Sequence, residues 1–338
     1  MKKFWIALSV LVLAVVLVCG GLYAYAYYYD HKVPNFTGEQ DLYVYPGMDP
    51  DGVCKSILAS GQVKMPSSLR RVFKEVKTLK PGHYRIDATC SSIYVARMLR
   101  LGWQTPVTLT LSGSIRTPGV LARKIGSQML ADSAAVVSFA TCADSIGLDP
   151  ALLFTRIIPD SYQMLWTTPV KDIFARLFKE RDAWWTAERV KAAEKQGLTP
   201  EEASTLASIV SGETNYEPEQ PAIACVYLNR LRTGMKLQAD PTVAYCFDYE
   251  PRRILRWMLE VDSPYNTYKN YGLPPGPISC PPKSCLEAVL NPDKHDYIYF
   301  CADPSFNGSH RFAVSYAEHL QNARAFQRAL TVRQRGEK

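Results

Sequence analysis

Residues 199–215 read TPEEASTLASIVSGETN, and this stretch predicts the helix around which the rest of the chain is organised. Thr199 is suited to cap the helix, because its hydroxyl oxygen accepts a hydrogen bond from a free backbone N–H of the first turn. Pro200 suits the first helical position, and Glu202 completes a capping box with Thr199. The stretch therefore predicts a helix with a well-defined beginning.

A carboxylate lies on the apolar side of this predicted helix. The apolar residues recur at helical spacing, at Leu206, Ile209 and Val210. Glu213 falls on the same stripe. A Glu in apolar surroundings has a raised pKa and can act as a general acid near neutral pH. The alternatives are an exposed Glu in the last turn, or one paired with Arg230 or Arg232.

The amino-terminal part of the chain predicts a membrane anchor. Residues 1–3 carry two lysines, and the uncharged stretch 4–28 follows them. It is long enough to cross a bilayer, since about 20 apolar residues suffice. Tyrosines crowd its far end as in an aromatic interface belt, and the lysines place the amino terminus in the cytoplasm. We expect a short polar stalk over 29–40.

Two other interpretations of this segment are less well supported by the residues. A cleaved signal peptide would end at Ala26, but the apolar run is longer than the usual 7–15 residues or so. A lipoprotein would need a small residue before Cys19, and Val18 stands there. The remainder of the chain has no second apolar run, so we expect it to lie outside the cytoplasmic membrane.

The composition excludes several classes of function. The chain has 338 residues and a net charge of +7, which leaves room for one large domain or two small ones after the anchor. The basic excess suits a polymer bearing carboxylates or an anionic membrane surface. Because basic tracts with interleaved aromatics are missing, we expect no nucleic-acid partner. We also expect no metal and no cofactor.

The nine cysteines have no CxxC spacing, so zinc-ribbon and thioredoxin-like sites are disfavoured. The eight cysteines outside the membrane segment could form disulfides in an oxidising compartment, although the sequence does not define the pairing. The alternative is a set of buried thiols that act as small apolar side chains. We favour that alternative for Cys225, which lies in the middle of a predicted helix.

The rest of the chain predicts an α+β fold in two parts. In the first part, residues 41–145, a strand, a turn and a helix begin at 41, and the same order returns at 107. Two such units suggest a small α+β module with an internal repeat. In the second part, 150–332, amphipathic helices dominate and a strand is expected at 296–300. We expect this second part to be a mixed α+β catalytic domain.

Four segments carry a resemblance to a known family. They read ASIVSGETN, YLNRLRTGMKLQADPTV, SPYNTY and GLPPGPIS. In this order and at these intervals they resemble the endolytic murein transglycosylases of the YceG-like family, from the membrane segment to about Leu330. In that family the Glu that precedes Thr in this helix is catalytic, which implies that Glu213 is the catalytic residue here. The resemblance also implies that 41–145 is a LysM-like module, which would hold glycan chains or merely act as a spacer.

The same segments supply the candidate substrate-binding residues, which are Asn229, Arg230, Gln238, Asp240, Thr242, Tyr265, Asn266 and Tyr268. For Asn229 and Arg230 the alternative is a polar network at the end of a helix. Asp240 precedes a proline, a pattern typical of a helix N-cap followed by a first-turn Pro, so a structural role is favoured for it. The aromatic side chains could lie against sugar rings.

Two departures from the family pattern concern the candidate site. Ser211 and Gly212 stand where relatives usually have an acidic and a polar residue, and Gly costs a helix about 1 kcal/mol relative to Ala. Cys280 stands where relatives usually have Asn, so any contact made by that Asn is missing here. His310 belongs to a family block as well; it either orients Glu213 or serves as a structural hydrogen-bond partner.

The resemblance implies a reaction that needs a single carboxyl group. Hydrolytic glycosidases ordinarily use two. In a lytic transglycosylase, one Glu protonates the oxygen between N-acetylmuramic acid and N-acetylglucosamine, and then takes the proton of the muramic C6 hydroxyl as that oxygen attacks C1. The alternatives are a lysozyme-like hydrolase with Asp240 or Glu217 as second carboxylate, and a non-catalytic glycan-binding scaffold.

The implied setting is bacterial cell-wall synthesis. Peptidoglycan glycan strands are the expected partner, cut within nascent strands so that their growth ends. The single anchor implies the inner membrane, with the catalytic domain on its outer side. The resemblance further implies proximity to the penicillin-binding synthases.

Overall fold

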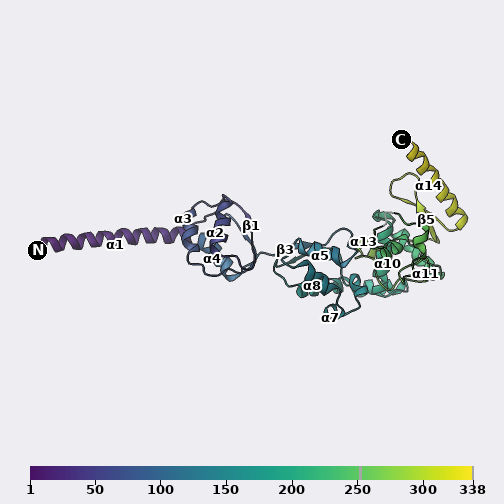
Figure 1. Ribbon diagram of the computed structural model, residues 1–338, viewed down its shortest axis with the longest axis horizontal. Coiled ribbons are helices and arrows are strands. Elements are labelled where there is room, and N and C mark those ends of the chain that lie inside the picture. Colours follow the sequence, from purple (N-terminus) through teal and green to yellow (C-terminus); the bar gives the residue numbers. More distant parts are fainter. Residues whose placement is uncertain (251–252, 337–338) are drawn as a thin grey trace. The chain divides into compact units, whose positions relative to one another are not determined.

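The structure, a computed structural model, describes residues 1–250 and 253–336 (Figure 1). Contacts between residues divide the chain into two compact units, each described separately below. Unit 1 comprises residues 1–109, 128–130 and 162–168. Unit 2 comprises residues 110–127, 131–161 and the described residues from 169 onward.

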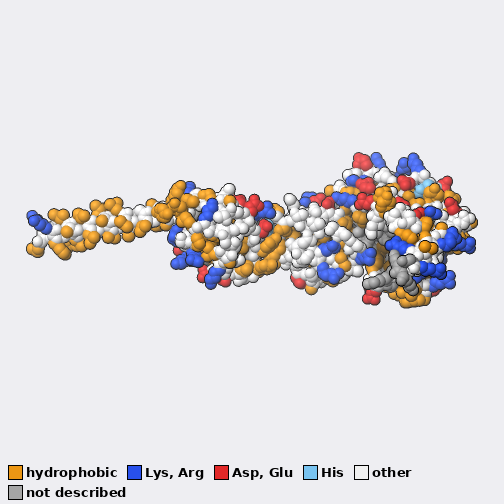
Figure 2. Space-filling model, turned by 90° about the horizontal axis from the view of Figure 1, so that it is seen from above, with side chains coloured by type: hydrophobic (Ala, Val, Ile, Leu, Met, Phe, Trp, Pro, Cys, Tyr) orange, Lys and Arg blue, Asp and Glu red, His pale blue; other side chains and the backbone are white. Residues whose placement is uncertain are grey.

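A long apolar helix, α1 (Lys2–His31), opens unit 1. Its side chains from Phe4 to Leu22 are exposed, and Figure 2 shows them as a hydrophobic surface with basic side chains at the amino-terminal tip. Among the described residues it is the one unbroken helix that is long and apolar enough to cross a membrane. The helix is therefore compatible with the predicted anchor.

The predicted stalk over 29–40 is wrong, because most of this segment is packed into unit 1. Asp30 accepts hydrogen bonds from the guanidinium of Arg71, with a shortest N–O distance of 2.6 Å. The amide of Asn35 donates to the carbonyl of Met65 at 3.1 Å, and Phe36 is fully buried. Polar composition alone suggested a stalk, whereas these side chains have partners far along the chain.

The folded part of unit 1 is built on an antiparallel pair of strands, with Gln40 opposite Ile86 and Val44 opposite Gly82. Its elements are β1 (Gln40–Val44), α2 (Pro50–Ala59), α3 (Pro66–Phe73), β2 (Gly82–Ile86) and α4 (Ser92–Leu101). The helices pack apolar residues such as Ile57, Leu69 and Leu99 against Tyr84 of the sheet. The result is a β-α-α-β unit followed by a helix.

A second pair of strands, β3 (Val107–Thr110) and β4 (Ser161–Met164), is separated by helices and crosses the division between the units. The intervening elements are α5 (Pro118–Gly126), α6 (Ser133–Ala140), α7 (Ala143–Ile146) and the 3-10 helix η1 (Pro150–Thr155). The strand–helix–helix order thus recurs. The units, however, divide near residue 110, whereas the sequence suggested 145–150, because α5, α6 and α7 pack within unit 2.

Most of unit 2 is a helical body with one two-stranded sheet, β5 paired antiparallel with β6. Its further elements are α8 (Val170–Trp184), α9 (Ala187–Lys195), α10 (Pro200–Glu213), η2 (Glu217–Glu219), α11 (Gln220–Arg232), α12 (Asp240–Cys246), η3 (Arg256–Glu260), α13 (Lys283–Leu290), β5 (Tyr299–Ala302), β6 (His310–Ala313) and α14 (Tyr316–Gly336). The prediction of a mixed α+β chain behind an apolar helix is confirmed. Helix α10 packs against both α11 and α13 and lies in the middle of the core.

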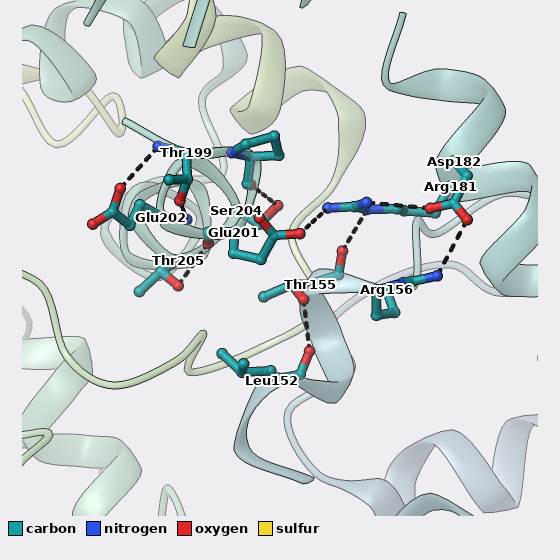
Figure 3. A network of polar contacts seen from close by, with 11 residues as sticks. Leu152, Thr155, Arg156, Arg181, Asp182, Thr199, Glu201, Glu202, Ser204 and Thr205 are labelled. Carbon is teal, nitrogen blue, oxygen red and sulfur yellow. Dashed lines mark hydrogen bonds and ion pairs between the residues drawn. The ribbon is translucent and has the colours of Figure 1, made fainter. Parts of the chain in front are cut away.

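The start of α10 is fixed by two sets of polar contacts. The predicted capping box is present: Thr199 accepts from the N–H of Glu202, whose carboxylate accepts from the N–H of Thr199. A buried arginine, Arg181, donates to Glu201 at 2.7 Å and to the carbonyl of Thr155 at 2.9 Å (Figure 3). These contacts connect α10 to α8 and η1, so its far end is held in a defined position.

All nine cysteines lie in the described part of the chain, and each is a free thiol. Cys225 is buried, as predicted, and its thiol donates to the carbonyl of His295. Cys280 is buried as well, and its thiol donates to the carbonyl of Ile157 at 3.3 Å. Burial raises the pKa of Cys280, so this thiol remains protonated and behaves as a small apolar side chain.

Candidate active site

Glu213 is the last residue of α10, and its carboxyl group is held by a tyrosine of the neighbouring helix. The hydroxyl of Tyr227, on α11, donates to Oε1 of Glu213 at 2.6 Å. Tyr227 is 1% exposed, whereas Glu213 is half-buried, with its carboxyl group at the surface of the groove described below. The sequence analysis did not identify Tyr227 as the partner of Glu213.

The surroundings raise the pKa of Glu213 from 4.5 to about 7. Burial is the main cause, because a poorly solvated carboxylate is disfavoured, and the nearby charge of Asp240 acts in the same direction. The hydrogen bond from Tyr227 and the positive charge of Arg230 lower the pKa and offset part of the rise. Glu213 is therefore protonated in a large fraction of molecules near neutral pH, which suits a general acid.

Arg230 is 7% exposed and connects three parts of the site. It donates through Nε to the carbonyl of Ile298 at 2.7 Å and through an amino group to the carbonyl of Leu237 at 2.5 Å. Its guanidinium also lies over the ring of Tyr299, 5.5 Å from the centroid. The contacts of Arg230 thus match the alternative of a polar network at the end of a helix. Its positive charge still lowers the pKa of Glu213.

Asp240 does not cap a helix, so that prediction is wrong. Helix α12 begins at Asp240 itself, with Ala239 at the N-cap position and without a side-chain cap bond. The exposed carboxylate of Asp240 instead accepts a hydrogen bond from the hydroxyl of Tyr268 at 2.5 Å. The bond to this tyrosine, 28 positions further along the chain, replaces a cap bond to the helix backbone, and Asp240 lines a depression together with Glu213.

Gln238 and Tyr268 line the same depression as Glu213, as does Asp240. Gln238 adopts a left-handed backbone conformation, with φ of 50°. Such a conformation costs a non-glycine residue about 1 kcal/mol or more and tends to occur at functional sites. Its N–H donates to the carbonyl of Thr267, which holds the residue against the SPYNTY segment.

The other four predicted substrate-binding residues do not line this depression. Thr242 and Asn266 are fully buried; Thr242 donates to the carbonyl of Ala239, and Asn266 donates to two carbonyls of its own loop. Asn229 donates to the carbonyls of residues 295 and 297, and Tyr265 packs on Tyr245 with ring centroids 4.4 Å apart. Of these contacts, those of Asn266 hold the segment that carries Tyr268.

Three depressions in unit 2 have Glu213 in their lining, and together they are called the groove here. The first, of about 620 Å³, is lined by Ser114, Arg116, Tyr249, Arg253 and Ser279 among others. The second, about 300 Å³, contains Gln238, Tyr268, Tyr299 and His319. The third, about 670 Å³, is lined by Tyr216, Phe306, His310 and Phe326 among others. Glu213 is therefore the residue that all three depressions share.

His310 lines the groove but does not orient Glu213. Its ring Nδ1 lies 2.8 Å from Oε2 of Glu219, and its backbone N–H donates to the other oxygen of the same carboxylate. The structural alternative is therefore confirmed. Tyr227 makes the contact that the sequence had suggested for His310. Among the described residues, no group of His, Cys, Asp or Glu side chains is arranged to hold a metal ion.

Comparison with known proteins identifies the family. The sequence model of the YceG-like family matches residues 42–325. The chain belongs to the YceG-like family. A crystal structure of a YceG-like protein from Listeria monocytogenes matches 84% of this chain and 98% of its own, with a TM-score of 0.56 and 25% sequence identity.

Two curated relatives of this YceG-like protein are named endolytic murein transglycosylase. The one from Bacillus subtilis is 40% identical over 153 residues, which cover 45% of this chain and 41% of the relative. The one from Streptococcus pneumoniae is 26% identical over 355 residues, covering 93% of this chain and 64% of the relative. The chain thus spans less than two thirds of the length of either relative.

Replacing Tyr227 by Phe in this YceG-like protein tests the arrangement around the carboxyl group. Because the lost hydrogen bond favours the ionised form, we expect Tyr227→Phe to raise the pKa of Glu213 further above 7. The pKa is measured by a nuclear magnetic resonance titration of 13C-labelled glutamate, with Glu213→Gln identifying the resonance. An unchanged or lowered pKa would show that Tyr227 does not stabilise the carboxylate.

Proposed function

We propose that this YceG-like protein is a membrane-anchored lytic transglycosylase that cuts peptidoglycan strands at internal positions. The bond cut is that between N-acetylmuramic acid and N-acetylglucosamine, and the product carries a 1,6-anhydro ring. The proposal is supported by one observation above all. The half-buried Glu213, with a pKa of about 7, lines all three depressions of the groove.

The geometry suits an acid that becomes a base within one turnover. Protonated Glu213 donates its proton to the glycosidic oxygen, and the bond from that oxygen to C1 breaks. The resulting carboxylate accepts the hydrogen bond of Tyr227, which stabilises it. It then takes the proton of the C6 hydroxyl while that oxygen bonds to C1, so Glu213 regains its proton and no water is consumed. A pKa near 7 suits both halves of the reaction.

Glycans would lie along aromatic and polar side chains on either side of Glu213. Gln238, Tyr268 and Tyr299 line one depression, and Phe306 lines another. Flat rings lie well against the apolar faces of pyranose sugars. Several depressions around one carboxyl group suit a polymer, because sugars on more than one side of the cut bond can then be held.

A hydrolase is the second candidate, because Asp240 faces the same depression as Glu213 and is not used as a cap. Glu217 suits the second carboxylate less well, since it is exposed in η2 and does not line that depression. In the hydrolase, Asp240 would activate water or attack C1 directly. In the transglycosylase, Asp240 acts only through its charge on Glu213 and its bond to Tyr268.

The substitution Asp240→Asn distinguishes the role of Asp240 in a hydrolase from its role in a transglycosylase. In the transglycosylase we expect a loss of about tenfold or less in kcat, together with a lowered pKa of Glu213, because Asp240 raises that pKa. A hydrolase would lose about 10³-fold or more, as removal of an essential carboxylate does. The rate of strand cleavage and its pH dependence give the answer, and Tyr268→Phe is the control for the lost hydrogen bond.

The chemistry of the new ends tests the main proposal. The full chain is incubated in detergent with purified murein, and the ends are analysed by mass spectrometry. Anhydro-muramic ends support the transglycosylase, and hydrated reducing ends support the hydrolase. If the folded protein binds murein without cutting it, the scaffold interpretation replaces both.

The location of the protein and the role of unit 1 are further proposals. We propose that α1 lies in the inner membrane with both units on its outer side, close to the penicillin-binding synthases. We further propose that the β-α-α-β part of unit 1 is LysM-like and holds glycan, an idea supported by two exposed tyrosines, Tyr43 on β1 and Tyr45 just after it. Loss of glycan binding by Tyr43→Ala would support that role.

A further inference from the structure

Two arginines line the 620 Å³ depression beside Glu213, and the reaction proposed above does not use them. Arg116 lies between β3 and α5, and Arg253 follows α12. Both side chains are exposed. Within residues 1–250 and 253–336, neither arginine forms an ion pair with an acidic side chain. The depression therefore offers two guanidinium groups to a ligand.

Arg116 is held in position by a tyrosine that is itself fixed. The guanidinium lies over the ring of Tyr249, 4.5 Å from its centroid, and the Tyr249 hydroxyl donates to the carbonyl of Ile278. Asp248 and Tyr249 both adopt left-handed backbone conformations, with φ of 52° and 60°. Such backbone strain tends to be kept where a side chain must be placed for function.

The acidic groups in the depression leave these positive charges available. The carboxyl group of Glu213 accepts the hydrogen bond of Tyr227, and its raised pKa of about 7 leaves a large fraction of it neutral near neutral pH. Asp240 accepts the hydrogen bond of Tyr268. The rest of the polar lining includes the hydroxyl groups of Ser114, Ser211 and Ser279. Guanidinium groups pair with carboxylates in two-pronged hydrogen bonds, so an anionic group fits here.

We propose that Arg116 and Arg253 bind carboxylates of the peptide stems that branch from the glycan strand. They would make the groove selective for strands that still carry their peptides. This inference rests on the proposed function, since it takes peptidoglycan as the polymer in the groove. A stem is attached to every muramic acid, so one is always close to the bond being cut. A pyrophosphate at the end of a nascent strand would be out of reach of an internal cut.

The test compares binding of two glycans to the full chain in detergent. One is a set of soluble murein strands with intact peptides, and the other is the same set after the lactyl amide bond has been cut enzymatically. Glu213→Gln is present in every protein, so no strand is cleaved. We expect about tenfold tighter binding of the peptide-bearing strands, and a ratio of about two or less once Arg116→Ala and Arg253→Ala are added.

Arg256→Ala is the matched control. Arg256 is exposed and lies three positions from Arg253, but it does not line the depression, so its loss should leave the tenfold ratio intact. Because the readout is a ratio, a general loss of glycan affinity does not imitate the effect. Thermal melting confirms that the double variant is folded.

Three results would overturn the inference: equal affinity for both glycans, an unchanged ratio in the double variant, or displacement of peptide-bearing strands by inorganic pyrophosphate better than by free stem peptide. The last would assign the arginines to a phosphate group. Wild-type cleavage of the same strands separates this inference from the proposed function. If anhydro-muramic ends form but the two glycans bind equally well, the inference is refuted and the proposed function stands. If no anhydro-muramic ends form, the proposed function is refuted, and the ratio of the two affinities still decides the inference.

Discussion

Glu213→Gln should abolish strand cleavage and leave a folded protein that still binds glycan. Gln keeps the shape of the side chain and can still accept a hydrogen bond from Tyr227, but it has no proton to give and cannot take one back. We expect kcat to fall by about 10³-fold or more, in the upper range for loss of a general acid that also acts as base. The measurement is the release of anhydro-muramic ends from murein by the full chain.

The same substitution should stabilise the protein at alkaline pH. The pKa of Glu213 is about 7 in the folded protein and 4.5 when unperturbed, so its contribution to stability is fully present below 4.5 and is lost as the pH rises through 7. That loss amounts to about 3 kcal/mol, and a neutral Gln escapes it. The free energy of unfolding of Glu213→Gln, relative to wild type, should therefore be higher at about pH 8.5 than at about pH 4.

A different pattern would contradict the assignment. An exposed and ordinary carboxylate would give the same difference in unfolding free energy at both pH values, and a Glu that only holds the structure together would be destabilised by the change. Loss of cleavage combined with a gain in alkaline stability is the signature of a site that is strained for its function. Glu202→Gln, which alters the capping box at the other end of α10, serves as the control for a Glu outside the groove.

The parts of the site that sequence predicted are those fixed by local spacing. The capping box at Thr199 and Glu202 is decided within one turn of helix, and the structure contains it. The inward position of Glu213 follows from the helical period of its apolar neighbours. Both inferences need only residues close together in the chain. For the same reason the apolar helix α1 and the mixed α+β character were predictable.

The parts that sequence did not predict depend on partners distant in the chain. Asp240 has the sequence pattern of an N-cap, yet the hydroxyl of Tyr268 binds its carboxylate. Arg116 shares a depression with Glu213 although 97 positions separate them in the numbering. Phe36 is fully buried within a segment whose polar composition suggested a stalk. Composition and local spacing do not show which residue, far away in the chain, will contact a given side chain in the folded protein.

Gly212→Ala should lower both stability and activity, although alanine is the better helix former. A Cβ atom built on Gly212 lies 2.6 Å from Cβ and 2.8 Å from Cγ of Pro241. The proline ring is rigid and begins helix α12, so relief of the clash moves the start of α12 and with it Asp240. The cost of such overpacking, about 1–3 kcal/mol, exceeds the gain of about 1 kcal/mol in helix propensity. We therefore expect a net loss of about 1 kcal/mol.

The effect on activity should be larger than the effect on stability. A shift of about 1 Å in a group that surrounds the reacting atoms costs about 10²-fold in rate, and Asp240 and Tyr268 both depend on the start of α12. The glycine beside Glu213 is thus explained by packing: it lets α12 approach the end of α10 closely. The measurements are urea denaturation and the rate of strand cleavage.

Gly119→Ala is the matched control, because Gly119 also lies in a helix, α5, and its nearest neighbour beyond that helix backbone is the hydroxyl of Thr117 at 3.8 Å. That substitution should stabilise the protein by up to about 1 kcal/mol and leave cleavage unchanged. Pro241→Gly removes both clashing atoms, so in its presence Gly212→Ala should cost less than it does alone. If the two substitutions were additive, contact with Pro241 would not be the reason for the glycine, and the close approach of α10 and α12 would need another cause.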